Sequence, residues 1–156
     1  MILIEEKQQE ISDSINYAKR IQDAMMTSFV YLNDTLPKSF IFFKPKDIVS
    51  GDFYWIEKVG KHIYFAVADC TGHGVPGAFM SMIGTSLLNE IIVEKGISDT
   101  NKILDEMRTQ IIKSLNQDSE DDQKDGMDIS ICKLNMKKQM LEYLLLFQLI
   151  IFLKFL

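Results

Sequence analysis

The stretch GDFYWIEKVGKHIYFAVADC, residues 51–70, decides the fold. Two runs rich in aromatic and β-branched residues flank the dipeptide Gly60-Lys61, a composition typical of two β-strands joined by a short turn. The second run alternates, so that every other residue from Ile63 onward lies on the same side as Asp69. The sequence therefore predicts an antiparallel hairpin whose second strand ends in a carboxylate.

The turn length predicts which residues of the hairpin face each other. If the turn consists of Gly60 and Lys61 alone, opposed residues have numbers that sum to 121, and Asp52 lies opposite Asp69. Opposed side chains of an antiparallel pair are about 4.5–5.5 Å apart at Cβ, so two carboxylates there repel each other. A hard divalent cation such as Mg²⁺ or Mn²⁺ would turn that repulsion into coordination. A slip of one residue would place the two aspartates on opposite faces.

Glycine-rich segments flank both aspartates. Residues 50–51 precede the first, and Gly72, His73 and Gly74 follow the second. Glycines permit a close approach of backbone to a small ligand, and a helix that begins near Pro76 would direct its N-terminus at the same region, where an anion is favoured. The alternative is a pair of exposed strand-end aspartates beside an ordinary glycine turn.

A helix is predicted over residues 4–26. Ile4, Ile11, Ala18 and Met25 recur every seven residues, and charged and amide residues fill most other positions. The pattern is typical of a short coiled coil or signalling linker, but it equally fits an amphipathic helix packed on its own domain.

The rest of the chain predicts an α+β fold with paired helices on an antiparallel sheet. Strands are expected at 40–43, 127–135 and 139–147, and helices at 76–94 and 101–115. The first of these helices is expected to bury Phe79, Met80, Ile83, Leu87 and Ile91.

The composition of the chain limits the kinds of function that it can have. The chain has 156 residues, of which 47% are hydrophobic and 25% charged, as in a globular domain. The net charge of −5 disfavours nucleic-acid binding, which needs a basic face. The two cysteines, Cys70 and Cys132, form neither a metal-type pair nor a disulfide framework, which favours the cytoplasm. The apolar segment 144–156 is short for a membrane span and fits a buried strand or an atypical terminus.

Two long motifs resemble a known family. FKPKDIVSGDFYW at 43–55 and VADCTGHGVPGAFMSMIG at 67–84 are similar to bacterial stage II sporulation protein E-like phosphatase domains, which are PPM-type protein phosphatases. INYAKRIQDAM at 15–25 resembles the linker helix that often precedes such domains, and KDGMDISIC at 124–132 resembles a later strand. The resemblance covers residues 11–143.

The resemblance implies a partial αββα sandwich and a division of the chain into three parts. These are a linker helix at 1–28, a phosphatase-domain portion at 29–143 and an atypical apolar tail at 144–156. It also implies a metal-dependent enzyme that removes phosphate from phosphoserine or phosphothreonine on a protein, often an anti-sigma-factor antagonist. The linker helix would allow a homodimer, and a non-catalytic dimerisation module is the alternative function.

The matched motifs also imply site roles for a two-metal centre of Mn²⁺ or Mg²⁺. Asp69 would bridge the metals, Cys70 would offer its backbone carbonyl, and Asp52 would be a ligand directly or through water. His73 fits a turn-forming or supporting role better than that of a general acid, and the role of Asp128 stays open. No residue is thereby assigned as a catalytic acid or base.

The chain departs from the family after its last matched strand. Relatives carry further metal aspartates there, whereas no Asp follows Asp128 and no Gly follows Gly126. The chain therefore resembles the first part of the domain followed by a foreign or frameshifted tail. We expect the binuclear site to lack ligands and the activity of this chain to be impaired.

Overall fold

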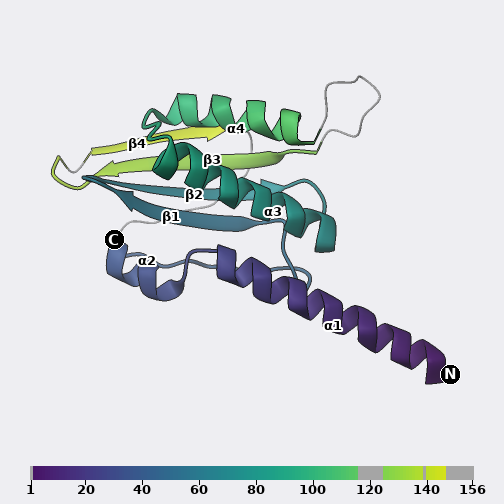
Figure 1. Cartoon of the computed structure of the whole chain (residues 1–156). Coiled ribbons are helices and arrows are strands. Elements are labelled where there is room, and N and C mark those ends of the chain that lie inside the picture. Colours follow the sequence, from purple (N-terminus) through teal and green to yellow (C-terminus); the bar gives the residue numbers. More distant parts are fainter. Residues whose placement is uncertain (1, 116–124, 139, 147–156) are drawn as a thin grey trace.

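The computed structural model describes residues 2–115, 125–138 and 140–146 and has the predicted α+β architecture. Its centre is a four-stranded antiparallel sheet in the order β1-β2-β3-β4, with helices packed against it (Figure 1). The elements in chain order are α1 (Ile2–Met25), α2 (Phe29–Thr35), β1 (Phe53–Val59), β2 (His62–Cys70), α3 (Gly74–Leu88), the π-helical turn η1 (Asn89–Glu94), α4 (Thr100–Ser114), β3 (Met127–Asn135) and β4 (Met140–Leu146).

The hairpin of β1 and β2 has the predicted register. Val59 pairs with His62 across a turn of two residues, and Phe53 pairs with Ala68 at the far end. Gly60 adopts φ +60°, the left-handed conformation that a tight hairpin turn requires and that glycine adopts without steric cost. The turn therefore fixes which residues of the two strands lie opposite each other.

The two faces of the sheet carry separate apolar clusters. One face packs against α3, η1 and α4 and forms the larger core, which includes Phe53, Trp55, Tyr64, Ala66, Ala68, Ile129 and Ile131. The opposite face forms a smaller cluster of Leu32 from α2 with Ile56, Ile63 and Phe65. Among the described residues there is one sheet, so this part of the chain corresponds to half of the sandwich that the resemblance implies.

Helix α3 and the turn η1 form one continuous apolar segment. Gly74–Glu94 is long and apolar enough to cross a membrane by length and composition alone. Its residues Leu88 and Ile91 are completely buried against the sheet and α4, which is the arrangement of a core helix. Phe79 departs from the predicted apolar stripe: its side chain is 60% exposed because it lies on the outer side of the first turns.

The segment between α1 and β1 differs from its prediction. No strand forms at 40–43, where Phe40 and the neighbouring Phe42 are exposed and no ladder partner lies alongside. Helix α2 was not predicted; the side chain of Ser28 caps it by accepting a hydrogen bond from the N–H of Tyr31 at 3.2 Å. The aromatic run at 40–43 has the composition of a strand, but no neighbouring strand is available for it to pair with.

The C-terminal hairpin follows its prediction as far as the structure describes it. β3 occupies the predicted 127–135, and β4 pairs with it from Met140 to Leu146. Of the predicted apolar tail, residues 144–146 belong to β4, and residues 147–156 lie outside the described residues. The proposed division at 1–28, 29–143 and 144–156 stays a prediction.

Candidate metal centre

Three aspartates lie in one row at the same end of the sheet. Asp69 pairs with Asp128 of β3, and Asp52 directly precedes the first residue of β1, where the register continues to Asp69. Opposed residues share a face, and alternation places this row on the side of Ile56 and Phe65, away from α3. The predicted juxtaposition of Asp52 and Asp69 across the hairpin is therefore confirmed.

The carboxyl groups of Asp52 and Asp69 contact each other. The pKa of Asp52 is raised above its ordinary value, first because neighbouring groups remove water from around it and then because it shares a hydrogen bond with Asp69 and is repelled by its charge. Such a contact needs one carboxyl to be protonated and to donate to the other. Two carboxylates held this close can instead be neutralised by a cation, which is the chemistry of a metal site.

The donor set for a metal is small within the described part of the chain. No cluster of three or more His, Cys, Asp or Glu side chains is suited to hold a metal ion among these residues. The exposed Asp128 stands in the row but does not join the contact between Asp52 and Asp69. The pair therefore fits part of a divalent coordination shell, with the remaining positions left to water, backbone or substrate oxygens.

Cys70 can contribute to such a site only through its backbone. Its side chain is buried in the larger core, on the face opposite Asp69. Burial raises the pKa of its thiol to about 12, and its position on the other face keeps the sulfur away from the two aspartates. The predicted involvement of its carbonyl oxygen stays a prediction.

Glycines bring three backbone segments together beside the aspartates. A Cβ on Gly77 would lie 2.7 Å from the carbonyl oxygen of Gly72 and 3.0 Å from the Cα of Gly51. A Cβ on Gly51 would in turn lie 2.9 Å from the same oxygen of Gly72. The glycines were expected to let the backbone approach a small ligand. In the structure they let one backbone segment approach another, which fixes the segment before Asp52 against the start of α3.

A buried glutamine of α1 holds the same segment from the other side. Gln22 donates through Nε2 to the carbonyl oxygen of Ser50 at 2.6 Å and to Oγ of Ser81 at 2.8 Å, and its Oε1 accepts from the N–H of Ser50 at 3.0 Å. Sequence reasoning did not find this residue, because an amide within a helix of charges and amides carries no distinct signal. Its partners are 28 and 59 residues away.

The loop after Asp69 is anchored to the beginning of β3. Thr71 donates from its backbone N–H to the carbonyl oxygen of Gly126 at 2.9 Å, and its hydroxyl also donates to that oxygen at 3.0 Å. The same hydroxyl oxygen accepts from the N–H of Gly126 at 2.9 Å. These bonds join the loop that follows Asp69 to the strand that carries Asp128.

His73 lies at the solvent-facing rim of the site. It occupies the position before α3 and is flanked by Gly72 and Gly74, whose φ angles are +85° and +63°. Its side chain is 77% exposed, and Nδ1 lies 3.1 Å from Oδ2 of Asp47. We predict from the resemblance that Gly72, His73 and Gly74 form the turn or contact the substrate, and both roles stay predictions.

Two known proteins are similar to this chain over most of its length. No protein-family model matches the chain. Phosphoserine phosphatase RsbU of Bacillus subtilis (strain 168) is 30% identical over 139 residues, which make up 87% of this chain and 38% of RsbU. The SiaA-PP2C domain of Pseudomonas aeruginosa superposes with a TM-score of 0.77 at 32% identity and covers 88% of this chain and 54% of that one.

The chain thus spans about two fifths of the curated relative and about half of the solved structure that it matches. Both similarities cover nearly all of this chain, including the aspartate hairpin and the glycine turn. By sequence and by fold, the chain therefore resembles part of a PPM-type (PP2C) phosphatase domain.

Proposed function

We propose that the chain is part of a metal-dependent protein phosphatase that removes phosphate from phosphoserine or phosphothreonine in a bacterial signalling pathway. The observation that carries the proposal is the contact between the carboxyl groups of Asp52 and Asp69 at the end of the β1–β2 hairpin. The relatives support it: one is a phosphoserine phosphatase by name, and the other is a PP2C domain. They favour a phosphatase over a non-catalytic module.

In this proposal Asp52 and Asp69 would hold Mn²⁺ or Mg²⁺, with the carbonyl of Cys70 as a third donor. Such ions supply an activated water and neutralise phosphoryl charge. The residues of the chain do the positioning. The close backbone contacts among Gly51, Gly72 and Gly77, together with Gln22, fix the backbone before Asp52. The hydrogen bonds of Thr71 fix the backbone after Asp69.

The N-terminus of α3 suits a phosphorylated substrate. Its first turn follows the glycine turn directly, so its free N–H groups and the positive end of its dipole lie beside the aspartate pair. The first turn carries no acidic residue that would oppose an anion. This polarity supports binding of a phosphoryl group on the solvent side of the pair.

The resemblance and the surface of α1 suggest a substrate, a cellular location and an oligomeric state. The resemblance suggests an anti-sigma-factor antagonist as substrate and a reducing cytoplasm as setting. A homodimer through α1 is supported by its exposed apolar side chains, because the N-terminal part of the helix extends away from the sheet (Figure 1). These exposed side chains are Leu3, Ile4, Ile11, Tyr17 and Ile21.

The test uses a chimera, because the described residues alone supply few metal ligands. Residues 1–143 would be joined to the segment that follows the matched region in RsbU, and release of phosphate from a phosphoserine protein would be measured with and without Mn²⁺. We expect Mn²⁺-dependent hydrolysis by the chimera, abolition by Asp69→Asn, and little or no turnover by the 156-residue chain.

Asp34→Asn is the matched control, since Asp34 is an exposed residue of α2 away from the sheet end. A folded chimera without activity, or one whose activity survives Asp69→Asn, would overturn the proposed function. Robust turnover by the 156-residue chain would show that its own residues complete the site.

A further inference from the structure

Two hairpin turns lie together at the end of the sheet that is opposite the aspartate pair (Figure 1). One is the turn of Gly60 and Lys61 between β1 and β2, and the other consists of residues 136–138 between β3 and β4. The N–H of Met136 donates to the carbonyl oxygen of Lys61 at 3.3 Å, so the two turns contact each other. These five residues are called the turn platform below.

Asn135, the last residue of β3, holds the second turn in shape. Its Oδ1 accepts hydrogen bonds from the N–H groups of Lys137 and Lys138, both at 3.1 Å. Its Nδ2 lies 3.3 Å from Nε2 of His62, the residue that follows the first turn and pairs with Asn135 in the sheet. Both turns of the platform are therefore held by the ends of the strands.

The turn platform carries three positive charges without partners. Lys61, Lys137 and Lys138 are exposed, and none of their ammonium groups forms an ion pair in the described part of the chain. The chain as a whole has a net charge of −5. The platform is therefore a local basic surface on an acidic chain.

The side chain of His62 responds to this positive charge. Its pKa is lowered, first because burial removes water from around it and then because the charges of Lys133 and Lys61 disfavour a further proton. Glu142 acts in the opposite direction, but its carboxylate is bound to Lys133 at 3.4 Å. Positive charge thus prevails at this end of the sheet.

Met136 adds an apolar side chain to the basic surface. It is 51% exposed and lies between the lysines of the two turns. Hairpin turns project from the end of a sheet, so their side chains form a convex surface. An apolar side chain flanked by lysines on such a surface suits the boundary of a lipid bilayer, where the apolar group enters the interface and the ammonium groups contact anionic headgroups.

The choice of lysine favours a bilayer over an acidic protein segment. Specific recognition of a carboxylate favours arginine, whose planar guanidinium binds both carboxylate oxygens. The charges of the turn platform are all lysines. Their ammonium groups are hydrated point charges on flexible stems, which suit an array of many equivalent headgroups.

We propose that the turn platform binds the anionic surface of a lipid bilayer and orients the chain on it. The platform and the aspartate pair lie at opposite ends of the β1–β2 hairpin, so the bound chain would direct Asp52 and Asp69 away from the bilayer. The aspartates would then stay accessible to a protein in solution. The proposal goes beyond the proposed phosphatase function and does not depend on it, because binding requires neither a metal nor turnover.

Sedimentation with lipid vesicles tests the proposal. The 156-residue chain would be mixed at low salt with vesicles of phosphatidylcholine, either alone or together with phosphatidylglycerol. A chelator would prevent metal ions from bridging the aspartates to lipid phosphate. We expect binding only to vesicles that contain phosphatidylglycerol, and loss of this binding at high salt, because salt screens exposed charges.

Two double variants with the same change in net charge separate the platform from the rest of the surface. Lys61→Glu/Lys137→Glu should weaken binding at least about tenfold, because two attractive charges near the anionic surface become repulsive. Lys7→Glu/Lys113→Glu should bind as wild type does, since these lysines belong to α1 and α4. Lys7 also tests α1, which has exposed apolar side chains of its own.

Urea denaturation of each variant would check the fold. If the glutamates lower the midpoint, the uncharged variant Lys61→Gln/Lys137→Gln replaces them, and it too should bind more weakly than wild type. Absence of binding to phosphatidylglycerol vesicles, equal binding to neutral vesicles, or an equal loss in the two double variants would overturn the proposal. Binding to polyglutamate in place of vesicles would assign the platform to an acidic protein and would overturn it as well.

Discussion

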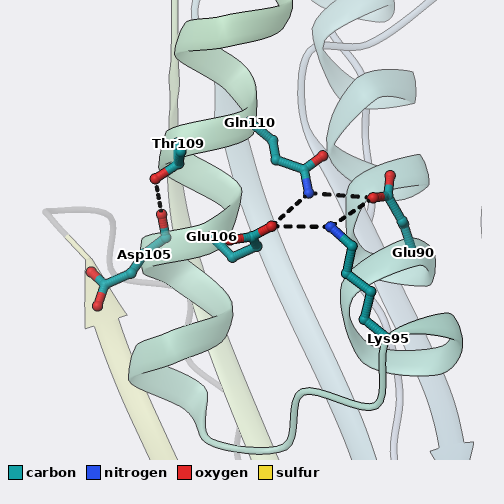
Figure 2. Close-up of polar contacts among 6 residues, drawn as sticks. All are labelled: Glu90, Lys95, Asp105, Glu106, Thr109 and Gln110. Atoms are coloured by element: carbon teal, nitrogen blue, oxygen red, sulfur yellow. Dashed lines mark hydrogen bonds and ion pairs between the residues drawn. The ribbon is translucent and has the colours of Figure 1, made fainter.

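Two regions of the molecule hold helices in place by polar contacts, and they do so in opposite ways. Beside the aspartate pair, the contacts are buried and uncharged: Gln22 bonds Ser50 and Ser81, all of which are almost completely inaccessible to solvent. At the far end of the helical layer, the contacts are half-exposed and involve charged side chains. Lys95 bridges Glu90 at 2.9 Å and Glu106 at 3.0 Å, and Gln110 donates to both carboxylates (Figure 2).

The difference shows where the structure depends on single residues. Exposed ion pairs contribute little because water solvates each partner when the pair is broken. A buried donor or acceptor that loses its partner has no water to replace it. The region beside the aspartates should therefore be sensitive to small changes, and the network between η1 and α4 should tolerate them.

The largest effect is expected for Gln22→Leu. The substitution keeps a similar volume but leaves the N–H and C=O of Ser50 without their partners. At about 1–3 kcal/mol for each unsatisfied buried group, the free energy of unfolding should fall by about 2–6 kcal/mol. Urea denaturation measures it. The control is Gln9→Leu on the exposed side of α1, where Gln9 donates to Asp13 and a change below about 0.5 kcal/mol is expected.

Equal destabilisation by Gln22→Leu and Gln9→Leu would contradict the assigned importance of the buried contacts. The same comparison in the presence of Mn²⁺ is informative, because Gln22 fixes the backbone two residues before Asp52. We expect the affinity for Mn²⁺ to fall in Gln22→Leu and to be retained in Gln9→Leu.

The next effect is expected for Gly77→Ala. The added methyl group would overlap the carbonyl oxygen of Gly72 and the Cα of Gly51, both of which belong to backbone and cannot rotate away. Overpacking of this kind costs about 1–3 kcal/mol, measured as a lower midpoint of denaturation. Gly126→Ala is the control, since no atom lies within 4 Å of a Cβ placed there. If both variants were equally stable, the backbone contacts of Gly77 with Gly72 and Gly51 would be looser than the structure shows.

A gain in stability is expected for Asp52→Asn in metal-free protein. The pKa of Asp52 is raised in the folded state. Its contribution to the free energy of unfolding is therefore fully present below its ordinary pKa of 3.8, where the carboxyl is protonated. This contribution is lost as pH rises through the folded-state pKa. Asparagine stays neutral throughout. Thermal unfolding should show a higher midpoint for Asp52→Asn at pH 7 and no gain at pH 3, whereas Asp34→Asn should show none at either pH. A loss at pH 7 would argue against the strained contact.

The smallest effect is expected for Lys95→Met. The pKa values of Glu90 and Glu106 are lowered, chiefly by hydrogen bonds with Lys95 and Gln110. Their contribution to the free energy of unfolding is therefore present above their ordinary pKa of 4.5. It is lost as pH falls through their folded-state pKa values. We expect a small decrease in stability at pH 7 that disappears in acid and in high salt. Lys138→Met in the exposed β3–β4 turn is the control. A decrease comparable to that of Gln22→Leu would invalidate the contrast between the two regions.

The sequence allowed the hairpin, its register and the aspartate contact to be predicted, because the two-residue turn at Gly60 fixes every pair in the ladder. It did not reveal Gln22, since the partners of that side chain come from distant segments. The run at 40–43 was wrong as a strand because strand propensity describes a side-chain pattern, whereas a strand also needs a neighbour to pair with. Helix α2 could have been found from Ser28, a favourable N-cap before a short apolar segment.

The central claim is that Asp52 and Asp69 form a divalent-metal site. Titration calorimetry with Mn²⁺, carried out on wild type, Asp69→Asn and the control Asp34→Asn, tests it most directly. The account predicts measurable binding by wild type and Asp34→Asn and loss of binding by Asp69→Asn, because Asp69 is one of the two carboxylates proposed to hold the metal. Equal binding by wild type and Asp69→Asn would contradict it.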